Sequence, residues 1–325
     1  MYAATLDDYL ALVDYGSLRR SHIRGFNQRV SRLAASIPSA ASAYFGFELP
    51  LARRAEETDF ALSLTRRGIE WASRRWSKVA RLCAITQRGG VEFPAIWLEF
   101  DTSATRGCGE APSIFVAADR ASANAIGTAL LAPASRHTLK ACVDAAPTEK
   151  LQIGFMVHGR RQPTRFCALA LDARAVRAFL KAIEWRGNYQ AVTAAIDSYA
   201  ELCDAFGVHV DVGKAIAPEI GLELLYDGPA ARHQPDREPR WRDLLRRLVL
   251  DELCSETERR ALLGWASERR IEAPLVERLV AAATTSPALL LHGTLRRGLA
   301  HVKLSFNRDG KAGAKAYYGA VFESG

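Results

Sequence analysis

Two alternating runs near the C-terminus, residues 301–306 and 314–321, carry the side chains best suited to bind an anion. A short turn that contains glycine joins them, so they are predicted to form a β-hairpin. Because successive side chains of a strand point to opposite faces, one face of this hairpin collects four groups: His301, Lys303, Lys315 and Tyr317. The opposite face is apolar. We therefore expect one side of the hairpin to pack and the other to meet a solvated, anionic ligand.

The same division into a polar and an apolar face recurs in two other predicted strand regions. In the run 96–101, the polar face carries Trp97, Glu99 and Asp101. In the strand pair 208–212 and 220–227, it carries His209, Asp211 and Glu223. Apolar residues occupy the alternate positions of these runs. The polar faces therefore predict a shared wet region rather than a single isolated patch.

Composition is that of a globular protein. The 325 residues are 49% hydrophobic, and no apolar run approaches the ~20 residues that cross a bilayer. The six cysteines have neither a CxxC nor a Cys/His ligand spacing, so we expect reduced thiols and no metal site. The N-terminus is acidic and lacks the basic region of a signal peptide. These features predict a cytoplasmic protein.

A formal charge of +8 suggests nucleic acid as one candidate partner. The arginines are dispersed in doublets, however, as is typical of solvated helix faces and loop edges. RNA binding is the weakest hypothesis, because the sequence has no RNP-like aromatic strand motif and no basic low-complexity tail. A basic balance equally suits a small anionic substrate such as a diphosphate.

Strand pairs alternate with helical blocks along the chain. The strands are predicted at 59–65, 96–101, 113–118, 151–158, 165–171, 208–212, 220–227, 301–306 and 314–321. Helices are predicted at 6–40, 70–87, 120–145, 172–187, 192–207, 241–249 and 274–283. A further helix is predicted to start at a capping box formed by Ser255 and Glu258.

This succession favours an α+β fold, an antiparallel β-barrel of about ten strands built from ββαα repeats with the helices outside. A doubly wound parallel sheet would need single, almost wholly apolar strands. Closing the sheet places the polar faces in a lumen, and a barrel of more than about eight strands is wide enough to hold a ligand. We expect residues 1–55 to form a helical segment that packs on a barrel domain, residues 56–325.

The repeated ββαα order and the strand Lys315-Ala316-Tyr317 resemble the αββα-barrel (ABBA) prenyltransferases, which include aromatic, indole and cyanobactin-type peptide prenyltransferases. The resemblance covers about residues 56–322. It implies an enzyme that moves an allylic isoprenoid, from dimethylallyl or geranyl diphosphate, to an aromatic or peptide side-chain acceptor. Biosynthesis of ribosomally made peptide natural products (RiPPs) is the implied setting. The family repeats Lys-x-Tyr or Arg-x-Tyr on several strands, whereas this chain has it on the last.

The resemblance also implies roles for individual residues. Lys303 and Lys315 match the diphosphate binders, and Tyr317 matches a residue that shields the allyl cation. Either Glu99, which matches an early lumen acid, or Glu223 would accept the proton of the acceptor. The predicted substrate-binding set is completed by His301, Trp97, Arg67 and Asp211.

The implied ligands follow from the same resemblance. No tightly bound cofactor is expected. Whether Mg²⁺ accompanies the diphosphate is a question that the resemblance does not decide. The sequence has no DDxxD-type cluster, which argues against the all-helical terpenoid synthases. Neither nucleic acid nor a membrane is expected as a partner.

A non-catalytic barrel protein that binds a peptide of a biosynthetic cluster is the main alternative. The scarcity of repeated Lys-x-Tyr strands favours it, because lysines on edge strands also serve to discourage aggregation. The combination of lysines with acids on the same faces favours the enzyme.

Overall fold

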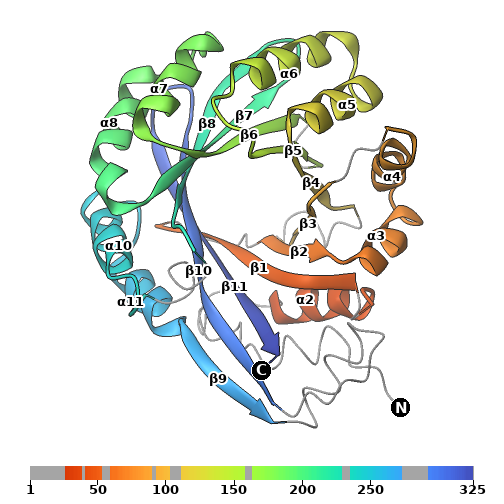
Figure 1. Cartoon of the computed structure of the whole chain (residues 1–325). Helices are drawn as coiled ribbons and strands as arrows, with labels where there is room; N and C mark the ends of the chain where they lie inside the picture. The colour runs from red at the N-terminus through yellow and green to blue at the C-terminus, as the bar shows by residue number, and fades with distance from the viewer. Residues whose placement is uncertain are drawn as a thin grey trace.

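The computed structural model describes residues 26–38, 41–52, 59–89, 93–102, 111–157, 163–228, 235–272 and 292–324. Its centre is an antiparallel sheet that closes on itself, because β11 pairs with β1 on one side and with β10 on the other. Figure 1 shows the strands around a central space, with helices outside them. The α+β barrel predicted from the sequence is confirmed.

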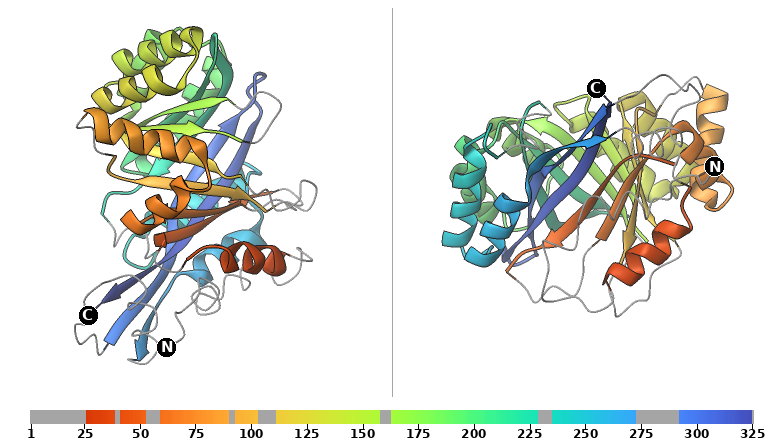
Figure 2. Two further views of the ribbon diagram at one scale, coloured as in Figure 1. Left: turned by 90° about the vertical axis from the view of Figure 1, so that its right-hand side faces the viewer. Right: turned by 90° about the horizontal axis from the view of Figure 1, so that it is seen from below.

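Ten strands form the closed ring. In order around it, they are β1 (Ser42–Pro50), β2 (Asp59–Leu64), β3 (Ile96–Asp101), β4 (Ser113–Ala118), β5 (Leu151–Phe155), β6 (Thr164–Leu171), β7 (Ala205–Val212), β8 (Ile216–Leu225), β10 (His292–Phe306) and β11 (Ala312–Ser324). An eleventh, β9 (Ser267–Glu272), pairs with the first half of β10. Figure 2 shows that β9, β10 and β11 project together past the other strands.

Helices surround this ring in the order that the strand pairs predicted. They are α2 (Phe26–Ala35), α3 (Arg66–Ser73), α4 (Ser77–Gly89), α5 (Arg120–Leu130), α6 (Pro133–Ala145), α7 (Ala173–Ala182), α8 (Tyr189–Tyr199), α10 (Arg240–Leu250) and α11 (Glu256–Trp265). The side chain of Asp172 accepts from the Ala175 N–H at the start of α7. Ser255 and Glu258 form the expected capping box on α11. Local sequence thus sets where these helices begin.

The hydrophobic core lies between the outer face of the barrel and the helices. On β2 and β3, Phe60, Leu98 and Phe100 are at most 1% exposed. Trp76 packs edge-on against Phe100, with the ring centroids 6.0 Å apart. The intervening Glu99 faces the lumen instead. The two-faced strands predicted from the alternation are therefore confirmed.

The barrel begins earlier than the predicted boundary at residue 56. Strand β1 pairs with both β11 and β2, so Ser42–Pro50 belongs to the barrel and not to a helical segment of residues 1–55. Without β1, the facing edges of β11 and β2 would lack their ladder partners. Pro50, which has no backbone N–H to donate, ends the strand.

Other elements differ in extent from their predictions. The helix predicted at 70–87 is two helices, α3 and α4, and β10 begins at His292 instead of residue 301. The predicted helix 274–283 and the part of the first helix before Phe26 lie outside the described residues. Within the described part of the chain, every helix is too short or too polar to cross a membrane.

Candidate active site in the barrel lumen

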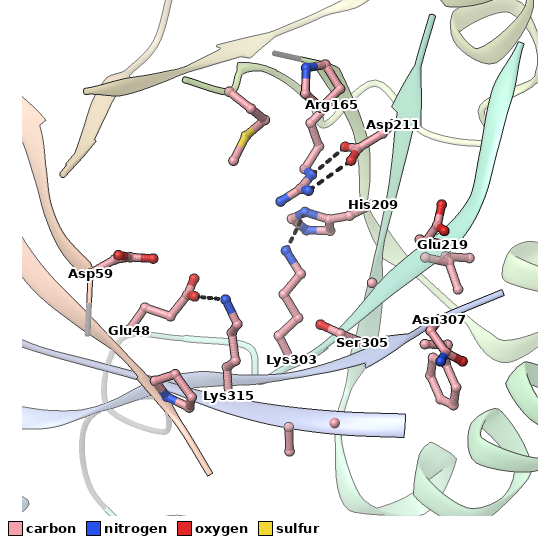
Figure 3. Close-up of a pocket in the computed structure, with 18 of the residues that line it drawn as sticks. Glu48, Asp59, Arg165, His209, Asp211, Glu219, Lys303, Ser305, Asn307 and Lys315 are labelled. Carbon is pink, nitrogen blue, oxygen red and sulfur yellow. Dashed lines mark hydrogen bonds and ion pairs between the residues drawn. The ribbon is translucent and has the colours of Figure 1, made fainter. Parts of the chain in front are cut away.

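The inner faces of the strands enclose a cavity of about 540 Å³. A volume of this size is typical of small-molecule sites. The charged side chains that line it are Glu48, Asp59, Glu99, Asp101, Arg165, Asp211, Glu219, Lys303, Lys311 and Lys315. Figure 3 shows Glu48 and Asp59 on one side of the cavity and Arg165, Asp211 and Glu219 on the other. The mixed acidic and basic lumen expected from the strand faces is therefore present.

Lys315 and Tyr317, two residues apart on β11, meet Glu48 on the neighbouring β1. The ammonium of Lys315 donates to one carboxylate oxygen of Glu48 and the hydroxyl of Tyr317 to the other. Burial opposes the ionisation of Glu48, but the charges of Lys315 and Lys303 and these hydrogen bonds lower its pKa to about 2. The charge of Glu48 in turn raises the pKa of Lys315. Lys315 and Glu48 thus form a neutralised pair.

Lys303 has a partner of a different kind. Its side chain is buried, and its Nζ lies 3.1 Å from Nδ1 of His209; Figure 3 marks this contact. Burial lowers the pKa of His209 to about 4, so the imidazole is neutral at neutral pH. Burial, together with the charge of Arg165, also lowers the pKa of Lys303. Lys303 therefore rests against a neutral group.

Glu223 lies behind this contact, between two histidines. Its Oε1 is 2.9 Å from Nε2 of His209 and 3.3 Å from Nε2 of His301. Burial opposes the ionisation of Glu223, but the two imidazoles lower its pKa well below the ordinary value. The ring of His301 stacks on Tyr317 with the centroids 4.1 Å apart. Glu223 and His301 therefore support the cavity wall from behind.

A third cation, Arg165 on β6, enters the cavity beside Lys303. Its Nε and Nη2 donate to the two oxygens of Asp211 on β7, over 2.8 and 3.2 Å. Both side chains remain about a quarter exposed, at 25% and 24%. Burial disfavours the charge of Arg165, but the hydrogen bond and charge of Asp211 more than offset this and raise its pKa. Asp211 therefore fixes the direction of the guanidinium.

Three carboxylates on adjacent strands crowd the other side of the lumen. Oxygens of Glu48, Asp59 and Glu99 lie within 4.8 Å of one another. Burial, followed by the charge of Glu48, raises the pKa of Asp59 to about 9 and that of Glu99 to about 7. At neutral pH Asp59 keeps its proton, whereas Glu99 is close to its pKa. Glu99 is thus the group here that gains or loses a proton most easily.

The structure brings most of the predicted site residues together in the lumen. Seven of them share this region: Glu99, Asp211, Glu223, His301, Lys303, Lys315 and Tyr317. Trp97 lies further along the same face of β3 as Glu99 and meets Tyr44 edge-on, with the centroids 5.4 Å apart.

Arg67 lies apart from this group. It is exposed on α3, outside the barrel, where it lines a separate hollow with Trp71, Arg74 and Arg75. The arginine follows strand β2 in the sequence, but the chain has already left the barrel where α3 begins. A ligand in the lumen would not meet its guanidinium.

Sequence reasoning missed Glu48, Asp59, Arg165 and the role of His209. Glu48 alternates with Phe47 and Leu49, which is a strand signal, but the segment was assigned to a helical region. Asp59 and Arg165 each stand beside a phenylalanine on a predicted strand and could have been placed on a polar face. The contact between His209 and Lys303 joins residues 94 positions apart, which no local pattern reveals.

Comparison with solved structures finds barrels of the same architecture along almost the whole chain. A 5-dimethylallyltryptophan synthase from Streptomyces coelicolor is 15% identical, with a TM-score of 0.51. A 6-dimethylallyl tryptophan synthase is 12% identical, with a TM-score of 0.52. A 6-dimethylallyltryptophan synthase from Micromonospora olivasterospora, solved in complex with DMASPP and Trp, is 13% identical, with a TM-score of 0.50.

Each alignment covers 97% of this chain and 97% of the other. No protein-family model matches the sequence, and no curated protein matches it. At these identities the likeness concerns the path of the backbone. The chain therefore has the barrel fold of the ABBA prenyltransferases, a closed ring of ten antiparallel strands with its helices outside.

Proposed function

We propose that this protein is an aromatic prenyltransferase, which moves a dimethylallyl or geranyl group from its diphosphate to an aromatic acceptor. The observation that carries the proposal is the convergence of Lys303, Lys315 and Arg165 on one cavity inside the barrel. Cations fixed in a region of low dielectric act more strongly on a developing anion than they would in water. A diphosphate leaving group is such an anion.

Transfer breaks the bond between the allylic carbon and the diphosphate oxygen and forms a bond from that carbon to the acceptor. Lys303 and Arg165 hold the diphosphate as it gains charge, and Lys315 joins them when the ligand draws it from Glu48. The aromatic ring of Tyr317 offers its negative face to the allylic cation. The barrel wall keeps bulk water away from the cation, which would otherwise be hydrolysed.

Glu99 is the proposed general base, which takes the proton that the acceptor loses. Its pKa of about 7 matches the pH at which a general base works well. Glu48, with a pKa of about 2, is too weak a base and instead holds Lys315 and Tyr317. Glu223 faces the two histidines, so its role is to support them.

Mg²⁺ enters this scheme with the substrate. The carboxylates of Glu48, Asp59 and Glu99 offer the oxygen donors that Mg²⁺ prefers. They do not fit a resident ion, because Lys315 and Tyr317 occupy both oxygens of Glu48 and Asp59 holds its proton at neutral pH. We expect the Mg²⁺ dependence of the rate to follow the concentration of the Mg²⁺–diphosphate complex. Elemental analysis of the dialysed protein would reveal a resident metal.

The acceptor is an aromatic ring, either free or on a peptide side chain as in RiPP biosynthesis. The test is incubation with dimethylallyl or geranyl diphosphate plus free tryptophan, or plus a peptide containing tryptophan and tyrosine. Mass spectrometry should show an acceptor heavier by one isoprenoid unit, together with release of diphosphate. The variant Glu99→Gln serves as the catalytic control and Arg67→Ala as the neutral one. Peptide binding without any turnover would instead support the non-catalytic alternative.

A further inference from the structure

His209 is buried between three strands of the barrel, behind Lys303. It is 4% exposed and lies on β7, where Cys167 on β6, Glu223 on β8 and Lys303 on β10 surround it. Two atoms compete for its Nδ1, namely Nζ of Lys303 at 3.1 Å and Sγ of Cys167 at 3.2 Å. An ammonium can only donate, whereas the Cys167 thiol, whose pKa is raised by burial, can either donate its S–H or accept.

These neighbours fix the proton of the imidazole. Since Nδ1 faces the ammonium of Lys303, we infer that it is the unprotonated nitrogen and that the proton lies on Nε2. Nε2 is 2.9 Å from Oε1 of Glu223, an anion that attracts an N–H proton at this distance, although the two groups do not meet at a hydrogen-bond angle. The charged groups that act on His209 are Glu223, Lys303 and Arg165. Burial and the charges of Lys303 and Arg165 favour the neutral ring, whereas the charge of Glu223 favours the protonated one.

Two glycines leave the space that this arrangement needs. A Cβ on Gly221 would lie 2.5 Å from Cε of Lys303 and 3.3 Å from Cβ of His209. A Cβ on Gly207 would lie 3.0 Å from Oε2 of Glu223. A side chain on Gly221 would therefore displace the end of Lys303, and one on Gly207 would press on Leu169 and Glu223. Glycines in β7 and β8 thus leave room for the side chains of His209, Glu223 and Lys303.

We propose that His209 is a positioning residue, which holds the ammonium of Lys303 in place for an anionic diphosphate without neutralising it. This inference rests on the proposed function. A lysine has a flexible stem, and fixing it in advance reduces the entropy lost when the ligand binds. A carboxylate in the place of His209 would also fix the lysine, but it would cancel the charge that the diphosphate needs. A neutral acceptor fixes the lysine without cancelling its charge.

Three variants separate this role from simple packing. His209→Phe keeps a ring but removes the acceptor, and we expect it to weaken the binding of inorganic pyrophosphate about 10- to 100-fold, the range for a hydrogen bond to a charged group. His209→Asn places an amide oxygen near Nδ1 and should restore most of the affinity. Cys167→Ala removes the competing thiol and is the matched control, with affinity expected within about twofold of the wild type.

The decisive experiment combines calorimetry of pyrophosphate binding with nitrogen-15 NMR of the histidine rings. The inference predicts a wild-type His209 with unprotonated Nδ1 and protonated Nε2, a weakened His209→Phe and a restored His209→Asn. A wild type that binds pyrophosphate while His209→Phe binds it equally well overturns the inference and leaves the proposed function standing. A protonated Nδ1 overturns it as well, even if His209→Phe fails to fold. A folded wild type that neither binds pyrophosphate nor transfers an isoprenoid overturns the proposed function itself.

Discussion

Two walls of the lumen treat charge in opposite ways. The acidic wall, Glu48, Asp59 and Glu99 on β1 to β3, crowds like charges together. The cationic wall, Arg165 on β6 and Lys303 on β10, separates its charges and directs each with a partner. Burial, followed by the charge of Glu48, raises the pKa of Asp59 to about 9 and that of Glu99 to about 7, so Glu99 is the group of this wall that titrates near neutral pH. On the cationic wall, Asp211 offsets the charge of Arg165, whereas Lys303 meets a neutral imidazole.

Lys315 shows how strongly a neighbouring side chain determines the charge that a lysine offers to a ligand. It stands opposite Lys303 in the β10–β11 register, yet it reaches Glu48 and is neutralised by it. Lys303 reaches a neutral imidazole. Two lysines on one hairpin therefore differ in the net charge that they offer to a ligand. The comparison teaches that the partner of a buried cation, and not its distance from the cavity alone, decides whether it can bind an anion.

The acidic wall is tested most strongly by Glu99→Gln. Removing a general base lowers turnover by about 10²- to 10⁴-fold, and the diphosphate affinity should hardly change, because the cations remain. In the wild type, turnover should rise as the pH increases through about 7, where Glu99 loses its proton. Steady-state rates between pH 5 and 9 measure both effects. A pH profile of the wild type without this rise would contradict the assignment.

The cationic wall is tested by comparing Lys303→Met with Lys315→Met. We expect kcat/KM to fall about 100-fold in the first variant, as for the loss of one electrostatic contact to the transition state. The second should fall about 10-fold, because Lys315 must first leave Glu48. Rates at several diphosphate concentrations give both values. Equal losses would show that the two lysines do not differ in the charge that they offer to the diphosphate.

The variant Glu48→Gln should change both the binding of the diphosphate, through Lys315, and the pKa of Glu99. It removes the negative charge that neutralises Lys315, so the KM for the allylic diphosphate should fall about two- to fivefold. It also removes a charge that raises the pKa of Glu99, so the pH at which turnover rises should move below about 7. The same pH series measures the shift. A shift to higher pH would mean that Glu48 does not act on Glu99 through its charge.

Asp59→Asn should change stability with little effect on diphosphate binding. Folding raises the pKa of the Asp59 carboxyl from 3.8 to about 9. Between these pH values the unfolded chain loses this proton while the folded protein keeps it, so the free energy of unfolding decreases as the pH increases. Asparagine does not ionise, so the variant should melt about 2–4 °C higher at pH 8 and gain nothing near pH 4. Thermal melts at the two pH values decide this. Asp236→Asn, at a side chain that is 85% exposed, is the control and should be neutral at both.

The strand faces explain why so much of the fold could be predicted. Val302 and Leu304 alternate with Lys303, and the structure buries the first two in the hydrophobic core while the lysine faces the lumen. Period-two alternation is a local property that a sequence displays directly. Closure of the barrel required β1, whose strand signal is interrupted by Gly46 and ends at Pro50. Its omission also hid Glu48.

The site was harder to predict than the fold, because its chemistry depends on contacts between distant strands. Glu48 and Lys315 are 267 positions apart, and His209 and Lys303 are 94 apart. A strand pattern states which face a residue occupies but not its height in the barrel. For this reason Trp97 shares a face with Glu99 and yet meets Tyr44 instead of the cavity charges.

The most direct test of the account is a crystal structure with an allylic thiolodiphosphate, an analogue that resists ionisation. The account predicts that the diphosphate lies inside the barrel, within hydrogen-bond distance of Lys303 and Arg165, with Lys315 drawn away from Glu48. The isoprenoid tail should lie alongside Tyr317 and Glu99. An analogue bound outside the barrel, or in the lumen without any contact to Lys303, would contradict the central claim.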